Sequence, residues 1–170
     1  MRNGEQNTMR AFLSHKSTDK AFVQEVANYL GRSRVVFDVF EFSTGDEFHE
    51  AIRKGIDRSD IFVLFASRDA LESEWVQFET NVAEEAISAR ALSKAACYII
   101  DDTLSVDDLP LWLRHTLATR QTSPRLVALD IRRLINESIA SRRPRFYVGR
   151  NDKMEEALDA IASDSNPLIV

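Results

Sequence analysis

Cysteine, histidine, glycine and long apolar runs are all scarce in this chain of 170 residues, and each scarcity excludes a class of protein. The single cysteine, Cys97, excludes an internal disulfide, and the histidines at positions 15, 49 and 115 share no helical face with a second metal ligand. The glycines at positions 4, 31, 45, 55 and 149 allow neither a GxGxxG motif nor a Walker A loop. The longest apolar runs, 61–66 and 95–100, are far shorter than the roughly 18 residues of a membrane-spanning helix. The sequence therefore predicts no metal site, no glycine-rich phosphate loop and no membrane span.

An excess of positive charge is also missing. The chain has 22 Lys and Arg residues against 27 Asp and Glu residues, which gives a net charge of −5. The basic residues are scattered, so no stripe is available to neutralise the phosphates of a duplex. The first ten residues contain no apolar stretch that could serve as a signal-peptide core, and a lone thiol is ordinary in the cytosol. We expect a cytoplasmic protein that binds neither nucleic acid directly nor a membrane.

Short β-branched and aromatic runs alternate with longer segments of helical period along most of the chain. The predicted strands are 10–14, 34–40, 60–66, 95–101 and 126–131. A short, helical segment at 109–117 separates the last two. Alternation of this kind predicts βα units and a parallel sheet, and strands that are apolar on both faces predict helices on both sides.

The helix boundaries have their own signals. Ser17 or Thr18 is placed to cap a first helix, and Gly31 stands where a left-handed residue would end it. Asp46 is placed to cap a second helix, and Ser73 to start a long third one. A final helix is expected to run to about residue 141.

Three parts of the chain are expected from these patterns. Residues 1–8 read as a flexible N-terminus, 9–141 as one α/β domain, and 142–170 as a linker followed by a helix. The basic stretch 142–145 contains Pro144, which halts a helix. The apolar residues 168–170 have no closing element after them, and we expect a further domain beyond them.

Three segments directly follow the first three predicted strands, namely 14–20, 41–46 and 67–79. In an open parallel sheet the ligand crevice lies off the carboxyl ends of the strands, so these segments are expected to border it. Within the third segment, Trp75 and Glu79 are four residues apart and therefore neighbours on one helix face. A carboxylate beside an indole on an apolar face is a candidate for an acid of perturbed pKa. The spacing leaves a plainer alternative, in which Glu79 is solvated and Trp75 anchors the core.

The other two segments leave similar alternatives open. His15 is either a site residue or a hydrogen-bonded turn residue, and Gly45 is either a ligand contact or a requirement of the turn. Phospho-receiver domains share this strand order, but they need an acidic pair after the first strand and an Asp at the end of the third. Those positions read Ser14-His15 and Ala66-Ser67, which excludes that class.

At these three segments the sequence resembles the Toll/interleukin-1 receptor (TIR) domains. The matching pieces are FLSHKSTDKAFVQEVANYL at 12–30, FDVFEFSTGDEFHEAIRKGIDRSDIFVLFAS at 37–67, and SEWVQFE at 73–79. The resemblance extends over about residues 8–140. It implies the α/β fold of the family, a flavodoxin-like five-stranded parallel sheet with helices on both faces, and it makes EFSTGD at 41–46 the BB loop.

The resemblance also implies an activity. Catalytic TIR domains cleave NAD at the nicotinamide–ribose bond with a Glu four residues after a Trp or another bulky residue, a pattern that Glu79 and Trp75 match. The residues implied to bind the substrate are Ser14, His15, Lys16, Ser43, Gly45 and Trp75. NAD is then the substrate, and no separate cofactor is expected. The product is left open between linear ADP-ribose, a cyclic isomer and a base-exchange product.

The partners implied by the resemblance are NAD and other TIR domains, through self-association. The expected role is that of an effector in immune or cell-death signalling. The alternative is a non-enzymatic scaffold that signals by homotypic contacts. TIR adaptors that only bind other TIR domains often lack the Glu, so Glu79 favours the enzyme.

The tail carries a second resemblance. FYVGRNDKMEEALDAI at 146–161, followed by NPLIV at 166–170, is similar to the lead-in of STAND-type signal-transduction NTPases. In those proteins a helix precedes the strand that runs into a P-loop. The resemblance implies that the domain is the amino-terminal effector of a larger sensor, and the alternative is an ordinary amphipathic helix with Met154, Leu158 and Ile161 on one face.

Overall fold

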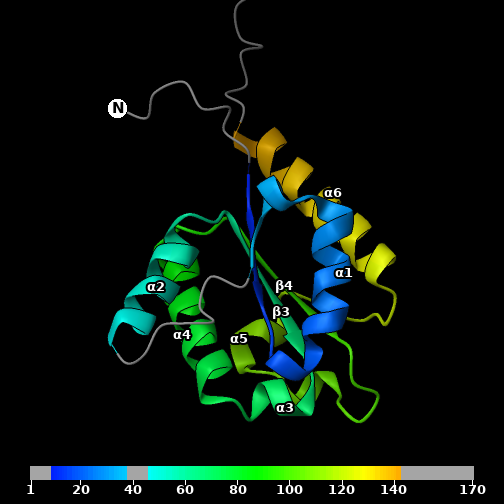
Figure 1. The fold of residues 1–170 in the computed structure, drawn as a ribbon. Helices are drawn as coiled ribbons and strands as arrows, with labels where there is room; N and C mark the ends of the chain where they lie inside the picture. The colour runs from blue at the N-terminus through cyan, green and yellow to red at the C-terminus, as the bar shows by residue number, and fades with distance from the viewer. Residues whose placement is uncertain (1–8, 38–45, 143–170) are drawn as a thin grey trace, which may run out of the picture. The chain divides into compact units, whose positions relative to one another are not determined.

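A five-stranded parallel sheet lies at the centre of the computed structural model, which describes residues 9–37 and 46–142 (Figure 1). The strands are β1 (Ala11–Ser14), β2 (Val35–Val36), β3 (Ile61–Ala66), β4 (Lys94–Ile99) and β5 (Leu117–Arg120). Their order across the sheet is β2-β1-β3-β4-β5. This is the flavodoxin-like order, and it confirms the fold class expected from the sequence.

Helices cover both faces of the sheet. The α-helices are α1 (Lys20–Leu30), α2 (Asp46–Asp57), α3 (Arg68–Leu71), α4 (Glu74–Ser88), α5 (Leu111–Arg114) and α6 (Pro124–Arg142). Short 3-10 turns, named η1 to η3, lie at Ser17–Asp19, Arg32–Arg34 and Val106–Asp108. Figure 1 shows α1 and α6 on one side of the sheet and α2 and α4 on the other. Two apolar clusters, one on each face, form the core.

Strand β3 shows why the sheet needs cover on both sides. All six of its residues are buried. Ile61, Val63 and Phe65 belong to the cluster under α1 and α6. The alternate residues Phe62, Leu64 and Ala66 belong to the cluster under α2 and α4. Because side chains alternate across a strand, a strand that is apolar at every position fits only between two helical layers.

The structure agrees with most of the predicted helix boundaries but not with the start of the first helix. Helix α1 ends at Gly31, whose φ of 91° lies in the region that favours glycine. Helix α2 begins at Asp46, and Ser73 is the residue before α4. Helix α1 starts later than its predicted cap, because a 3-10 turn occupies Ser17–Asp19.

The fifth predicted strand is wrong. Residues 126–131 lie inside α6, and the fifth strand is Leu117–Arg120, which begins at the last residue of the segment expected to be helical. The helix expected in that segment is α5, at Leu111–Arg114. The buried residues of α6 are Val127, Ala128, Ile131, Leu134, Ile135 and Ser138. Their spacing of three and four residues is helical, and Pro124 stands at the first helical position, where its missing N–H costs nothing. A short apolar run does not by itself distinguish a strand from a buried helical segment.

The remaining predicted boundaries lie near the ends of the described residues or outside them. The predicted second strand, 34–40, is described only as far as residue 37, and β2 itself is Val35–Val36. The final helix ends at Arg142, close to the expected residue 141. The expected flexible N-terminus, the tail from residue 143, Ser43 and Gly45 lie outside the described residues. Among those that are described, no helix has both the length and the apolar character needed to cross a membrane.

Candidate functional site

Strand β1 and helix α4 meet through two polar side chains at the carboxyl edge of the sheet. Ser14, the last residue of β1, donates a hydrogen bond from Oγ to Oε2 of Glu79 at 2.5 Å. Both side chains are enclosed, with 1% of Ser14 and 9% of Glu79 exposed. The contact joins residues 65 positions apart in the sequence, so the fold creates it.

The position of Glu79 on α4 explains its burial. Val76, Thr80 and Ala83, which share its side of the helix, are also buried. These residues face the apolar cluster that fills the space between α4 and the sheet. Glu79 therefore stands within the core-facing stripe of an amphipathic helix, where an apolar residue is the ordinary choice.

Burial also changes the acidity of this carboxyl group. Burial raises the pKa of Glu79 from its ordinary 4.5 to about 7, because an enclosed carboxylate loses its hydration. The hydrogen bond from Ser14 acts in the opposite direction, since it stabilises the ionised form. Near neutral pH, Glu79 therefore exists in both protonated and ionised forms.

Trp75 does not anchor the core. Its side chain is 46% exposed, although it lies one turn from Glu79. The plainer alternative that the spacing left open is thus wrong for both residues, since Glu79 is buried and Trp75 is at the surface. With 3.6 residues per turn, residues i and i+4 point in directions that differ by about 40° around the helix. In α4 this difference is enough for Glu79 to face the core while Trp75 faces solvent.

An aromatic cluster that includes Trp75 joins α2 to α4. The ring of His49 lies 6.1 Å from Trp75 and 4.3 Å from Phe78, measured between centroids. The guanidinium of Arg53 lies 5.6 Å from the centre of the Phe78 ring. The sequence offered no reason to place His49 here, because its neighbours in this cluster come from a different helix.

His15 and Lys16 follow Ser14 but turn in different directions. The His15 Nδ1 atom is 3.1 Å from the carbonyl oxygen of Leu13, and its ring stacks on Phe37 with the centroids 5.1 Å apart. Lys16 Nζ donates to Ser73 Oγ at 3.4 Å, at the start of α4. The structure therefore brings Ser14 and Lys16 to α4, while the hydrogen bond of His15 fits the turn residue that the sequence also allowed.

A second polar link crosses the same edge and was missed from the sequence. Ser67, which follows β3, donates from Oγ to Asp19 Oδ2 at 2.5 Å and accepts from the backbone N–H of Ala70 at 3.1 Å, which caps α3. Partial burial raises the pKa of Asp19, while Ser67 and the nearby His15 oppose that rise. The available signal was a Ser directly after β3 and an Asp five residues after the end of the adjacent strand β1.

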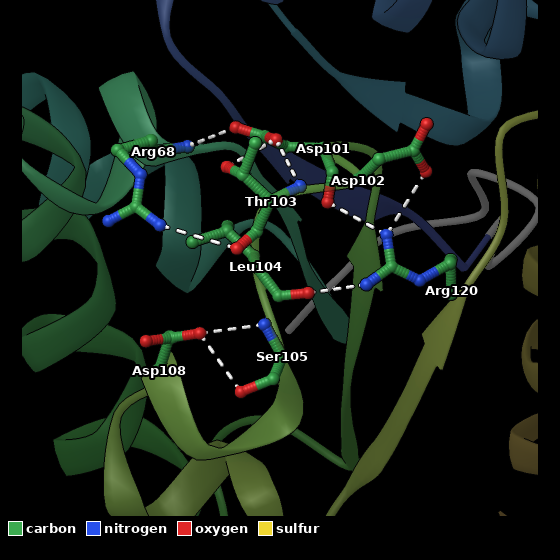
Figure 2. A network of polar contacts seen from close by, with 8 residues as sticks. All are labelled: Arg68, Asp101, Asp102, Thr103, Leu104, Ser105, Asp108 and Arg120. Carbon is green, nitrogen blue, oxygen red and sulfur yellow. Dashed lines mark hydrogen bonds and ion pairs between the residues drawn. The ribbon is translucent and has the colours of Figure 1, made fainter.

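A third polar group, drawn in Figure 2, lies after β4. Asp101 accepts hydrogen bonds from the backbone N–H of Arg68 at 3.0 Å, the backbone N–H of Thr103 at 2.8 Å and Thr103 Oγ1 at 2.7 Å. Arg120 donates to the carbonyl oxygens of Asp101 and Leu104. The hydrogen bonds to Asp101 lower the pKa of its carboxyl group to about 2, so this loop is held by an ionised side chain.

No group of three His, Cys, Asp or Glu residues is positioned to hold a metal ion within 9–37 and 46–142. A surface pocket of about 150 Å³ lies beside α4, lined by Leu71, Val76, Gln77, Thr80, Asn81 and Pro110. It contains neither Ser14 nor Glu79. The polar pair therefore remains the candidate site.

Comparison with known proteins gives the family. Residues 11–123 match the family model described as "TIR domain". No curated protein sequence matches the chain.

Three solved structures show the same fold. The TIR domain of the Toll-related receptor TRR-2 from Hydra magnipapillata has a TM-score of 0.56 at 13% identity, over 75% of this chain and 96% of that one. A TIR-STING receptor from C. gigas in complex with 2′,3′-cGAMP has a TM-score of 0.57 at 20% identity, over 78% of this chain but only 41% of the receptor. The CMP N-glycosidase BcmB from Clostridium botulinum has a TM-score of 0.50 at 13% identity, over 74% and 98%.

Proposed function

Because this chain belongs to the TIR domain family, we propose that it is an NAD glycohydrolase, which cleaves the bond between nicotinamide and ribose. The observation that carries the proposal is the buried Glu79 carboxyl group, bonded to Ser14 at the carboxyl edge of the sheet. Ligands of open parallel sheets bind at this edge. The CMP N-glycosidase acts on another nucleotide, as its name states, and its similar fold supports N-glycosidic chemistry here.

The reaction needs only one carboxylate. Nicotinamide leaves as a neutral amine from a cationic pyridinium, so no acid has to protonate it, unlike the leaving group of a two-carboxylate glycosidase. The ribose that remains has oxocarbenium character, and ionised Glu79 stabilises that positive charge. The stabilisation is strengthened by burial, because water screens the charges less. Water then adds to the anomeric carbon and releases a proton, which gives nicotinamide and ADP-ribose, whereas attack from within the substrate gives a cyclic isomer.

The surrounding residues have complementary roles in this proposal. The exposed indole of Trp75 offers a flat surface against which an aromatic base can stack. Lys16 follows β1, and its ammonium group, bonded to Ser73 at the start of α4, would favour the negative pyrophosphate of NAD there. His15, with Ser43 and Gly45 of the BB loop, completes the proposed binding residues. No cofactor takes part, because NAD is the substrate.

The proposed biological role is that of a cytoplasmic effector in immune or cell-death signalling, activated by self-association. Two of the similar structures are described as receptors, which supports a role in signalling. Self-association has a physical reason, since a second copy can close an open crevice and exclude water from the reaction.

The proposal is tested by incubating the purified chain with NAD over a wide range of protein concentrations and measuring nicotinamide and ADP-ribose by chromatography. Glu79→Gln should lower turnover roughly 10² to 10³-fold, the usual loss when a preorganised electrostatic stabiliser is removed. Glu84→Gln, a change at an exposed position of the same helix, should have little effect. Glu79→Gln with near wild-type turnover and unchanged circular dichroism would show that Glu79 is not the catalyst. Association of the chains without any NAD loss would favour the scaffold.

A further inference from the structure

Glu79 has a single polar partner among the described residues, and this partner is Ser14. The hydroxyl of Ser14 has one proton, and that proton is used in the bond to Oε2. Oε1 of Glu79 accepts no hydrogen bond from the residues that the structure describes. Ser14 is therefore bonded to the proposed catalytic group itself, although the family resemblance implied that it binds the substrate.

Ser14 is held firmly enough to orient this carboxylate. It is the last residue of β1, which lies between β2 and β3 in the sheet, and it pairs in register with Leu64 of β3. Its side chain is almost fully enclosed. The 2.5 Å between Ser14 Oγ and Glu79 Oε2 lies within the range of an O–H···O hydrogen bond.

We infer that Ser14 is a positioning residue, which holds Oε2 of Glu79 through its hydroxyl so that Oε1 acts on the ribose. The inference rests on the proposed function and extends it to the pH range of the reaction. A hydrogen bond to the charged form of a carboxyl group favours that form. Removal of the Ser14 hydroxyl should therefore leave burial unopposed and shift ionisation of Glu79 to higher pH.

Other charged groups on the neighbouring elements do not replace Ser14 in this role. The segments β1, α2 and α3 pack against α4, and the charged or titratable residues on or next to these four elements include His15, Lys16, His49, Arg53, Asp69 and Glu74. The rise in the pKa of Glu79 arises from burial, with Ser14 as the opposing influence, and no charged neighbour contributes to it. The ionisation of Glu79 should thus respond to Ser14 more than to these side chains.

The test measures the ionisation of Glu79 directly and its consequence for activity separately. The whole chain is labelled with ¹³C at the Glu carboxyl carbons and titrated by NMR, with the Glu79 signal assigned by its absence in Glu79→Gln. The wild type should titrate near pH 7. Ser14→Ala should titrate higher by about one pH unit, and the acidic limb of kcat/KM for NAD should move by the same amount, the shift expected for one lost hydrogen bond to a charged group.

Two further variants separate this role from a structural one. Ser14→Thr keeps a hydroxyl at the position and should restore the titration and the pH profile toward the wild type. Thr80→Val removes another buried hydroxyl next to Glu79, one that bonds to the Val76 carbonyl oxygen at 2.6 Å and not to Glu79. The pH at which Glu79 titrates should not change in Thr80→Val.

The outcomes distinguish this inference from the proposed function. An unchanged titration and an unchanged pH profile in Ser14→Ala would overturn the role of Ser14 while leaving NAD cleavage intact. A titration shift in Ser14→Ala without NAD cleavage by any form of the protein would support the Ser14–Glu79 pairing and reject the proposed activity. An equal shift in Thr80→Val would overturn the inference, because the effect would then belong to any buried hydroxyl.

Discussion

Two carboxyl groups at the same edge of the sheet have opposite acidities. Glu79, on α4 beside the end of β1, is enclosed, has one hydrogen bond and has its pKa raised to about 7. Asp101, just after β4, is only partly buried, accepts three hydrogen bonds and has its pKa lowered to about 2. Hydrogen bonds lower the pKa of both groups, but only Glu79 loses enough hydration to reverse their effect. Desolvation therefore decides whether the pKa of each carboxyl group is raised or lowered.

The difference also separates structure from function along this edge. The charge of Asp101 favours the folded loop, because its bonds fix the N-terminus of α3 and the turn at Thr103. The charge of Glu79 opposes folding, because burial favours the neutral form. Groups that destabilise the fold in this way occur commonly at functional sites, where activity depends on them.

The largest expected effect is a gain in stability when Glu79 is changed to Gln. Below pH 4.5 both the folded and the unfolded chain carry a protonated Glu79, so its charge has no effect. Between pH 4.5 and about 7 the unfolded chain ionises Glu79 while the folded chain keeps it protonated, which lowers the free energy of unfolding by about 3 kcal/mol, and this loss is complete once the pH has passed about 7. Glu79→Gln should therefore stabilise the domain by up to about 3 kcal/mol at pH 8 in urea unfolding.

The control for this change is the same comparison at pH 4. There Glu79 is mostly protonated in both the folded and the unfolded chain and resembles Gln in charge and shape, so the two proteins should unfold at similar urea concentrations. An equal gain at both pH values would mean that the effect is one of packing, and it would remove the contrast with Asp101.

The next effect has the opposite sign and concerns Asp101→Asn. Asn offers one acceptor oxygen where Asp101 offers two, and Arg68 and Thr103 donate to different oxygens. The variant should melt a few degrees below the wild type at pH 7. The folded pKa lies below the ordinary 3.8, so this stability is present above pH 3.8 and is lost as the pH falls through about 2.

Thermal melts followed by circular dichroism at pH 7 and at pH 3 check this prediction, and Asp102→Asn is the matched control. Asp102 is far more exposed and contacts Arg120 at 3.2 Å, a type of surface pair that contributes little. Equal losses in Asp101→Asn and Asp102→Asn would show that net charge, not the hydrogen bonds to Asp101, stabilises the loop.

The smallest effect on stability is expected at Asp19, whose burial is intermediate between that of Glu79 and that of Asp101. Partial burial raises its pKa, and the hydrogen bond from Ser67 opposes the rise. Its charge should therefore oppose folding above the ordinary pKa of 3.8, as for Glu79 but less strongly, because water still reaches it. Asp19→Asn should melt slightly above the wild type at pH 7 and with no difference at pH 3. A clear drop at pH 7 would mean that the Ser67 bond outweighs burial.

The sequence by itself determined most of the chain's local structure. Fully apolar runs such as 61–66 predicted strands between two helical layers, because period-2 alternation leaves no face for solvent. Gly31 and Asp46 marked helix ends, because the backbone there needs a left-handed residue or a capping group. The Trp75–Glu79 spacing selected the carboxylate that the fold buries at the carboxyl edge of the sheet.

The tertiary structure decided what depends on contacts between distant segments. Residues 126–131 form a helix because α6 packs its apolar stripe on the sheet, while the same residues suit a strand locally. Trp75 is exposed and Glu79 is buried because the rotation of α4 about its axis turns Glu79 toward the core and Trp75 toward solvent. The bond from Ser14, which opposes the effect of that burial, joins a strand end to a helix 65 residues away. The spacing of residues along the chain does not predict that Ser14 and Glu79 meet, because desolvation and hydrogen bonding depend on which surfaces come together after folding.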